Sequence, residues 1–205
     1  MKRGFYLKLA WSGIRKNRRL YTPYLLTCVG MVMMFYVVSF LSECPVLEEM
    51  RGGMTLQSML SFGSWVIGAF ALIFLFYTNS FLIRRRKKEF GLYNILGMGK
   101  GNLARILLWE SLIVAGMALI AGLFFGILLS KLAELGLVNG DITFSLSLGP
   151  DAILRTLLLF AVIFLLLLLN ALRQIHLTNP IELIHSENAG ERPPKANWFL
   201  ALAGI

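Results

Sequence analysis

Four apolar runs dominate this chain, and each is long enough to cross a lipid bilayer as a helix. A hydrocarbon core about 30 Å thick is spanned by roughly 20 helical residues. The runs are Leu20 to Leu41, Phe62 to Ile83, Ile106 to Ser130 and Ile153 to Leu172. With 57% hydrophobic and 15% charged residues, the chain is also more apolar than an ordinary soluble domain. The sequence therefore predicts an all-α, polytopic integral membrane protein.

The segments around these runs carry weaker signals. Residues 173–197 are polar and predict a cytoplasmic linker after the fourth run. A fifth apolar run occupies residues 198–205 and is too short to span, so we expect it to start a fifth transmembrane helix. On this basis we expect the 205 residues to be the N-terminal part of a longer protein. A turn signal at residues 139–141, followed by alternating apolar and polar residues up to Leu148, predicts a short strand or hairpin.

Positive charges are distributed unevenly among the loops. Seven Lys and Arg residues precede the first run, seven lie between the second and third runs, and three follow the fourth. The other two loops hold Arg51, Lys131 and Arg155. Cytoplasmic loops of membrane proteins carry the excess of Lys and Arg, so we expect a multi-pass plasma-membrane protein with a cytoplasmic N-terminus. The net charge of +9 then reflects topology and contact with anionic lipid, and predicts no nucleic-acid partner.

Residues 1–19 predict an amphipathic helix that lies flat on the inner membrane surface and leads into the first span. Its polar stripe would consist of Lys8, Ser12, Arg15 and Arg19, and its apolar stripe of Leu7, Trp11 and Ile14.

The loop between the second and third runs is the most distinctive segment. Five consecutive cations, residues 84–88, precede a stretch in which Glu89 is followed mainly by apolar and aromatic residues. These apolar residues exceed what a solvated loop needs, so we expect a short docking helix at about residues 86–97. Gly97 would end this helix in a left-handed conformation, and Asn102 would cap the third span. An ordinary charged loop is the alternative.

No pattern in the sequence predicts catalysis. Residues 97–102 resemble a phosphate-binding loop, but Asn94 stands where its first glycine belongs and Gly101 stands where Ser or Thr would bind magnesium. His176 and His185 lie in a polar tail with no cysteine near them, which does not favour a metal site. We therefore expect no enzymatic activity, no metal and no cofactor on this chain.

Two groups of residues inside the spans predict helix contacts. A carboxylate within a membrane needs a partner, and a polar belt of Asn79, Glu110 and Asn170 would join three spans by hydrogen bonds. A proton or substrate relay and a solvent-facing Glu110 are the alternatives. In the third span, small residues at four-residue spacing predict a groove for close packing of another helix, with a moving contact as the alternative. These residues are Ala118, Gly122 and Gly126.

These features together resemble the N-terminal half of an FtsX-like permease, and more closely the BceB type that accompanies bacitracin-resistance ABC transporters. The resemblance covers essentially the whole chain. Its most specific string is the basic run followed by Lys88-Glu89-Phe90-Gly91-Leu92-Tyr93, then Leu96-Gly97-Met98, then Arg105-Ile106-Leu107 and Glu110.

The resemblance implies a permease of ten spans with two FtsX-like units, of which residues 62–172 would be the first. It also implies a separate ABC ATPase, as a dimer, that binds ATP and magnesium and receives the docking helix in a groove. Glu89 would be the polar anchor there, and Phe90, Leu92 and Tyr93 the apolar contacts. The full set of implied coupling residues is Arg86, Glu89, Phe90, Gly91, Leu92, Tyr93 and Gly97.

Members of the BceB type protect bacteria against cell-wall-targeting peptides, and several form complexes with a membrane histidine kinase. The implied partners are thus the ATPase, the bilayer, a peptide antibiotic or its lipid-linked target, and such a kinase. One alternative is a mechanotransmitter of the cell-division FtsX kind, which activates an extracellular wall hydrolase. Another is a scaffold or sensor that binds a histidine kinase. A scaffold of this kind should tolerate Glu89→Lys, whereas the same substitution should disrupt docking to an ATPase. We expect Phe90→Asp to disrupt such docking as well.

Overall fold

The computed structural model describes residues 4–44, 47, 52–95, 97–137 and 149–177. The regular structure of these residues is helical, with no strand among them. The helices are α1 (Gly4–Lys16), α2 (Arg18–Ser42), α4 (Gly53–Arg85), α5 (Lys87–Ile95), α6 (Lys100–Leu137) and α7 (Pro150–Leu177). The predicted strand before Leu148, most of the linker and the start of a fifth span lie outside the described residues.

Four of these helices are long and apolar enough to cross a membrane: Arg18–Ser42, Gly53–Arg85, Lys100–Glu134 and Pro150–Ile175. They confirm the prediction of an all-α, polytopic membrane protein.

Two of the spans begin where the local sequence favours a helix start. The second begins at Gly53 rather than at Phe62, because Gly52 turns the chain with a φ of 85° and no Pro or Gly interrupts residues 54–61. The fourth begins at Pro150, whose fixed φ suits the first position of a helix and whose missing N–H is not needed there.

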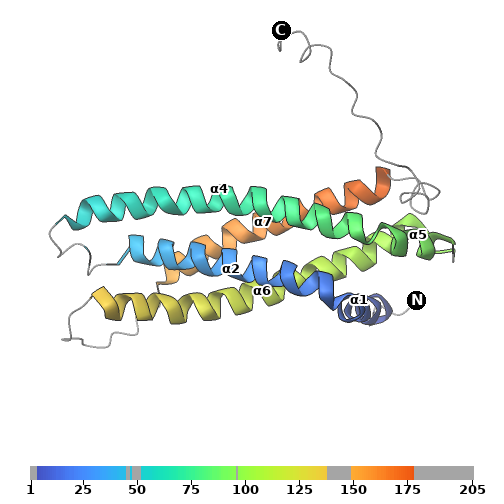
Figure 1. Ribbon diagram of the computed structural model, residues 1–205, viewed down its shortest axis with the longest axis horizontal. Coiled ribbons are helices and arrows are strands. Elements are labelled where there is room, and N and C mark those ends of the chain that lie inside the picture. The colour runs from blue at the N-terminus through green and yellow to red at the C-terminus, as the bar shows by residue number, and fades with distance from the viewer. Residues whose placement is uncertain (1–3, 45–46, 48–51, 96, 138–148, 178–205) are drawn as a thin grey trace, which may run out of the picture.

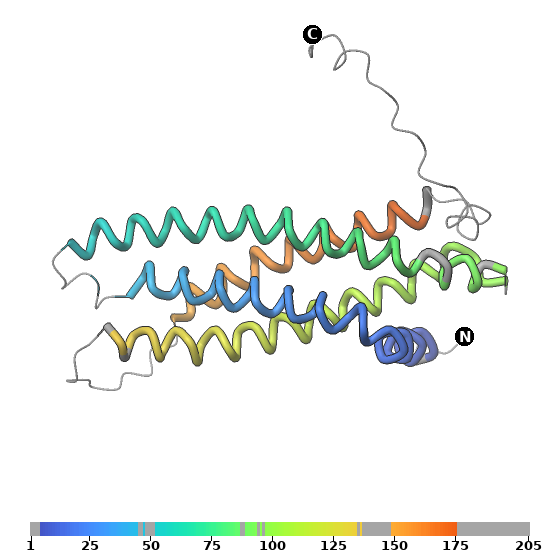
Figure 2. Tube along the Cα trace, viewed as in Figure 1, coloured from blue at the N-terminus to red at the C-terminus, as the bar shows by residue number. Residues whose placement is uncertain are grey.

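The four spans run side by side along the long axis of the molecule, with α2 between α4 and α6 (Figure 1). Helix α7 crosses behind them and contacts α2, α4 and α6 (Figure 2). The N-terminal ends of α2 and α6 and the C-terminal ends of α4 and α7 therefore lie at the same end of the bundle. Helices α1 and α5 lie at this end too.

The core is formed where the four spans meet. Cys28 and Val32 of α2, Leu75 of α4, and Phe160 and Ile163 of α7 are buried in one apolar cluster. Many outward-facing side chains of the spans are large and apolar as well. This is expected where lipid surrounds a bundle, because the spans then associate through close packing and hydrogen bonds rather than through a difference in hydrophobicity.

The small residues of α6 pack directly against α2. Ala118 is fully buried in the core, and a Cβ added at Gly122 would lie 2.6 Å from the Cβ of Val32. A Cβ added at Gly126 would lie 2.9 Å from Cδ1 of Tyr36. The absence of these side chains lets the two backbones approach, so the first span occupies the groove predicted from the sequence.

Helix α1 lies across the end of the bundle, and Figure 1 shows it almost end-on while the spans run horizontally. Tyr6 and Ala10 are buried against Ile106 of α6. Leu7 and Trp11, on the predicted apolar stripe, remain exposed. A helix across the spans with an exposed apolar stripe has the geometry of an interfacial helix.

We expect Gly122→Ala to destabilise the protein, because the new methyl group would overlap Val32. Overpacking of a close contact costs about 1–3 kcal/mol. The matched control is Gly116→Ala on the same helix, where an added Cβ has no neighbour within 4 Å. Thermal unfolding in detergent micelles should show a lower midpoint for Gly122→Ala alone. Equal midpoints for the two variants would contradict close packing of α2 on α6.

Candidate functional site

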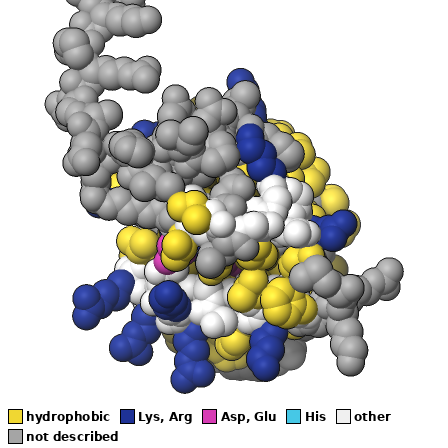
Figure 3. Space-filling view, turned by 90° about the vertical axis from the view of Figure 1, so that its right-hand side faces the viewer, with side chains coloured by type: hydrophobic (Ala, Val, Ile, Leu, Met, Phe, Trp, Pro, Cys, Tyr) yellow, Lys and Arg dark blue, Asp and Glu magenta, His cyan; other side chains and the backbone are white. Residues whose placement is uncertain are grey.

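Cationic side chains surround the end of the bundle at which α1 and α5 lie. Figure 3 views the molecule from this side and shows Lys and Arg distributed around its rim. Among the exposed cations are Arg19 of α2, Arg84 and Arg85 of α4, Arg105 of α6 and Arg173 of α7. Every span thus contributes positive charge to this end, which we call the cationic end.

Helix α5 has nine residues and is separated from α4 by a single residue, Arg86. Its C-terminal turn has the predicted glycine: Gly97 has a φ of 84°, and the N–H of Met98 donates to the carbonyl of Tyr93 at 3.0 Å. This bond belongs to the Schellman motif, in which a left-handed glycine ends a helix. The prediction for Asn102 is wrong, because α6 already begins at Lys100 and the Asn102 side chain accepts a hydrogen bond from Tyr6.

The side chains of α5 divide into a buried and an exposed set. Phe90 is only 2% exposed, and Tyr93 packs beside it against α4, α6 and α7. Leu92 and Ile95 are 57% and 66% exposed. Phe90 is therefore not available for the contact with an ATPase that the resemblance implied. It instead anchors α5 to the rest of the chain. The residues of α4, α6 and α7 around Phe90 are Ile83, Leu103, Leu107, Ala171 and Ile175.

A buried ion pair lies beside this anchor. Arg86, the residue between α4 and α5, donates from Nη1 to Oε2 of Glu110 at 2.5 Å and from Nη2 to Oε1 at 3.0 Å. Both side chains are 3% exposed. The Tyr21 hydroxyl donates to Glu110 at 3.0 Å and accepts from Arg86. Arg86 also lies over the rings of Tyr21 and Phe90. Bidentate pairs of this kind combine strength with a fixed geometry.

Electrostatics keep Arg86 charged in this buried position. Burial alone disfavours the charged guanidinium, but the hydrogen bonds and negative charge of Glu110 outweigh it. As a result the pKa of Arg86 lies above its ordinary value.

A second carboxylate extends this cluster to the corner between α1 and α2. Glu89 accepts hydrogen bonds from Nε of Arg86 at 3.1 Å and from Nδ2 of Asn17 at 2.7 and 2.9 Å. Gly13 of α1 touches the ion pair, since a Cβ added there would lie 2.7 Å from Oε1 of Glu110. One polar cluster therefore joins α1, α2, α4, α5 and α6. We call it the inner polar cluster: Asn17, Tyr21, Arg86, Glu89 and Glu110.

The other polar residues predicted inside the spans form a separate group. Asn79 donates to the Leu167 carbonyl at 3.2 Å, and Asn170 donates to the Ser80 hydroxyl at 3.1 Å. These bonds join α4 to α7. The hydrogen bonds of the described residues do not link Glu110 to either asparagine, so the single belt expected from the sequence is divided in two.

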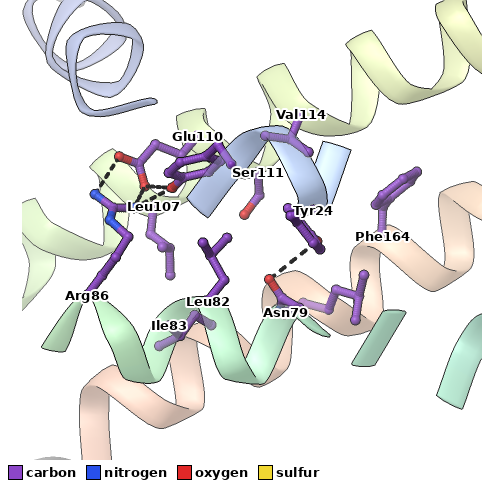
Figure 4. A pocket seen from close by; sticks show the side chains of 12 residues that line it. Tyr24, Asn79, Leu82, Ile83, Arg86, Leu107, Glu110, Ser111, Val114 and Phe164 are labelled. Carbon is purple, nitrogen blue, oxygen red and sulfur yellow. Dashed lines mark hydrogen bonds and ion pairs between the residues drawn. The ribbon is translucent and has the colours of Figure 1, made fainter. Parts of the chain in front are cut away.

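A small cavity of about 20 Å³ lies between the two polar groups (Figure 4). Tyr24 reaches Asn79 at one side of it, and Arg86 and Glu110 lie at the other. This volume is enough for about one water molecule. It is too small for a peptide or lipid ligand, so the arrangement is suited to holding helices together.

Sequence reasoning identified Arg86 and Glu110 separately but did not pair them, and it missed Asn17 and Tyr21. A signal for the pair was present, because an intramembrane carboxylate needs a cation and residues 84–86 supply cations at the membrane edge. For Asn17 and Tyr21 there was no signal, since their role depends on how α1 folds back on α6. Among the described residues, no group of three or more His, Cys, Asp or Glu side chains could hold a metal ion.

Comparison with known proteins identifies the family. Residues 61–180 match the family described as FtsX-like permease C-terminal, which is more than half of the chain. The chain belongs to the FtsX-like permease family. In this FtsX-like permease, the matched residues include all of α5, α6 and α7. They also include α4 except for its first turns.

Several curated permeases are similar over most of this chain. An ABC transporter permease of Bacillus subtilis (strain 168), YvcS, is 31% identical over 201 residues, which is 95% of this chain and 31% of that protein. A bacitracin export permease protein, BceB, of Halalkalibacterium halodurans is 28% identical over 200 residues, 96% of this chain and 31% of that protein. BceB of Bacillus subtilis is 27% identical over 165 residues, which is 79% of this chain and 26% of that protein. This FtsX-like permease chain therefore spans about a third or less of the length of these relatives.

We expect Arg86→Met to destabilise the permease and Glu110→Gln to reverse much of the loss. Removing one partner of a buried ion pair leaves an uncompensated charge, at a cost of about 3–5 kcal/mol. Neutralising Glu110 as well removes that charge. The free energy of unfolding, measured by denaturant titration in bicelles for both single variants and the double variant, checks this expectation. Arg84→Met is the control because Arg84 is exposed in the last turn of α4, two residues before Arg86. Additive losses in the double variant would contradict the pairing.

Proposed function

We propose that the chain forms part of the membrane subunit of an ABC transporter, and that α5 receives the movement of a separate ATPase subunit. The supporting observation is the exposed Leu92 and Ile95 on a short helix between two spans. Exposed apolar patches rimmed by polar residues mark protein–protein interaction sites. The names of the relatives, ABC transporter permease and bacitracin export permease, support the same proposal.

The inner polar cluster and Phe90 make α5 suitable for transmitting force. Phe90 inserts between α4, α6 and α7, and Glu89 is bonded to Arg86 and to the corner before α2. When ATP and magnesium bind to the partner and its subunits close, a push on α5 would reach all four spans at once. In this proposal the chain itself does not hydrolyse ATP.

The cationic end defines the orientation in this proposal. Lys and Arg concentrate in cytoplasmic loops, and most cations of the described residues lie at the end where α1 and α5 lie. The N-terminus and α5 would thus lie on the cytoplasmic side of a bacterial plasma membrane, where ATP is available. The C-terminal ends of α2 and α6 and the N-terminal ends of α4 and α7 would face the outside.

For the substrate, we propose a peptide antibiotic that acts on the cell wall, or the lipid-linked target of that peptide, removed or released at the outer face. Support comes from the two relatives named as bacitracin export permeases. A membrane histidine kinase is a further partner that the resemblance implies. The mechanotransmitter and the kinase scaffold are distinguished from this proposal by what co-purifies with the protein.

We expect Leu92→Asp and Ile95→Asp to abolish ATPase co-purification and peptide resistance while leaving membrane insertion intact. Both side chains are exposed, so neither change disturbs the core. Losing an apolar anchor of an interface costs about 2 kcal/mol or more, which is at least about thirtyfold in affinity. Phe90→Asp is a poorer test, because Phe90 is buried in its own protein.

Pull-down of the complete permease from native membranes, with mass spectrometry and a bacitracin growth assay, checks this prediction. The control is Ser12→Asp, which adds the same charge at an exposed position of α1. Normal resistance and an undiminished ATPase signal in both α5 variants would refute docking through α5. A kinase or wall hydrolase recovered without any ATPase from the wild type would favour one of the alternatives.

A further inference from the structure

Helix α5 is held to the protein by two anchors, one apolar and one polar. The apolar anchor is Phe90, and the polar anchor is Glu89, whose side chain is 32% exposed. Phe90 and the neighbouring Tyr93 hold one side of this nine-residue helix against α4, α6 and α7, and Glu89 joins it to Arg86 and Asn17. The direction in which Leu92 and Ile95 point therefore depends on what holds Glu89 as well as on the apolar anchor.

Asn17 holds Glu89 from an unusual position. It is the residue that precedes α2, where an asparagine side chain ordinarily accepts a hydrogen bond from the first turn of the helix. Here the side chain makes no such bond, and its amide nitrogen instead contacts both carboxylate oxygens of Glu89, at 2.7 and 2.9 Å. Asn17 and Glu89 are 72 residues apart in the sequence. The asparagine is therefore used to contact α5 rather than to cap its own helix.

The backbone of Asn17 is fixed on both sides. Its N–H donates to the Gly13 carbonyl at 3.0 Å, and its carbonyl accepts from the N–H groups of Leu20 and Tyr21 at 2.9 and 3.1 Å. These bonds hold Asn17 at the corner between α1 and α2, so its side chain starts from a defined point.

Helix α1 is in turn fastened to α6. Its Tyr6 hydroxyl donates to Asn102 at 2.9 Å, Ala10 is fully buried, and Gly13 allows α1 to approach Glu110 closely. The corner that carries Asn17 is therefore positioned by α6 as well as by α2.

We propose that Asn17 is a positioning residue for α5: it holds Glu89, so the corner between α1 and α2 sets the orientation in which α5 presents Leu92 and Ile95 to the ATPase. This inference rests on the proposed function and assigns the N-terminal helix a part in it. It also gives Glu89 a different role from the one implied by the resemblance, in which Glu89 contacts the ATPase directly.

The two roles of Glu89 are separated by exchanging donor and acceptor across the contact. Asn17→Asp places a second carboxylate against Glu89, which should repel it and release α5. Glu89→Gln alone keeps a carbonyl oxygen that still accepts from Asn17, so its effect should be smaller. In the double variant, the amide of the new glutamine can donate to the new aspartate, which restores a hydrogen bond with the opposite polarity.

The experiment measures the Kd of the purified ATPase for the complete permease in nanodiscs, together with the thermal midpoint of the permease alone. We expect Asn17→Asp to weaken ATPase binding about tenfold, which is about 1.4 kcal/mol, with little change in the midpoint. Adding Glu89→Gln to that variant should restore binding to within about threefold of wild type, the factor for about 0.65 kcal/mol. Ser12→Asp, with the same added charge on the exposed side of α1, should bind normally.

Glu89→Gln would thus improve binding in one background and weaken it in the other. Weaker binding in both backgrounds, with the losses adding, would overturn the inference, because Glu89 would then act on the ATPase independently of Asn17. A fall in the thermal midpoint that parallels the loss of binding would also overturn it, since Asn17 would then only stabilise the fold. No ATPase binding by the wild type is a different result, and it would refute the proposed function itself.

Discussion

The buried pair of Arg86 and Glu110 is the constraint on which the cationic end depends. Two opposite charges removed from water are tolerated only when the geometry is good and their remaining polar atoms are bonded. Tyr21 and Glu89 provide those bonds, and each of them comes from a different helix. These bonds form only when three parts of the chain are positioned together. They are the start of α2, the turn between α4 and α5, and the part of α6 that carries Glu110. A shift of any of these helices would expose a charge to an apolar environment.

Much of the fold follows from the sequence because lipid leaves few choices for the backbone. An apolar run long enough to cross a bilayer has to satisfy its own hydrogen bonds, and a helix does so within the segment. The four spans were therefore predictable from length and composition, and Gly97 at the end of α5 was predictable because glycine favours the left-handed end of a helix. The early start of α4 was not, because residues 54–61 are helical through local backbone preference rather than through strong hydrophobicity.

The candidate site was predictable only in part. The sequence marks Glu110 as a charge that needs a partner and Arg86 as a cation at the membrane edge, but their pairing depends on how α4 and α6 are placed together. Phe90 shows the limit most clearly. Its position in an amphipathic segment is equally compatible with a partner's groove and with the protein's own core, and the neighbouring spans decide between them. The identity of the family adds the expectation of docking but does not say which side chains face outward.

Helices α1 and α2 are joined by a single residue, Asn17, and so are α4 and α5, by Arg86. Each joint is short enough to act as a hinge, yet both joint residues donate to the same carboxylate, Glu89. Bending at either joint must therefore break or stretch a bond that also steadies the other. The two corners of the cationic end cannot open independently, and a displacement that begins at one of them has to involve the first span as well as the second.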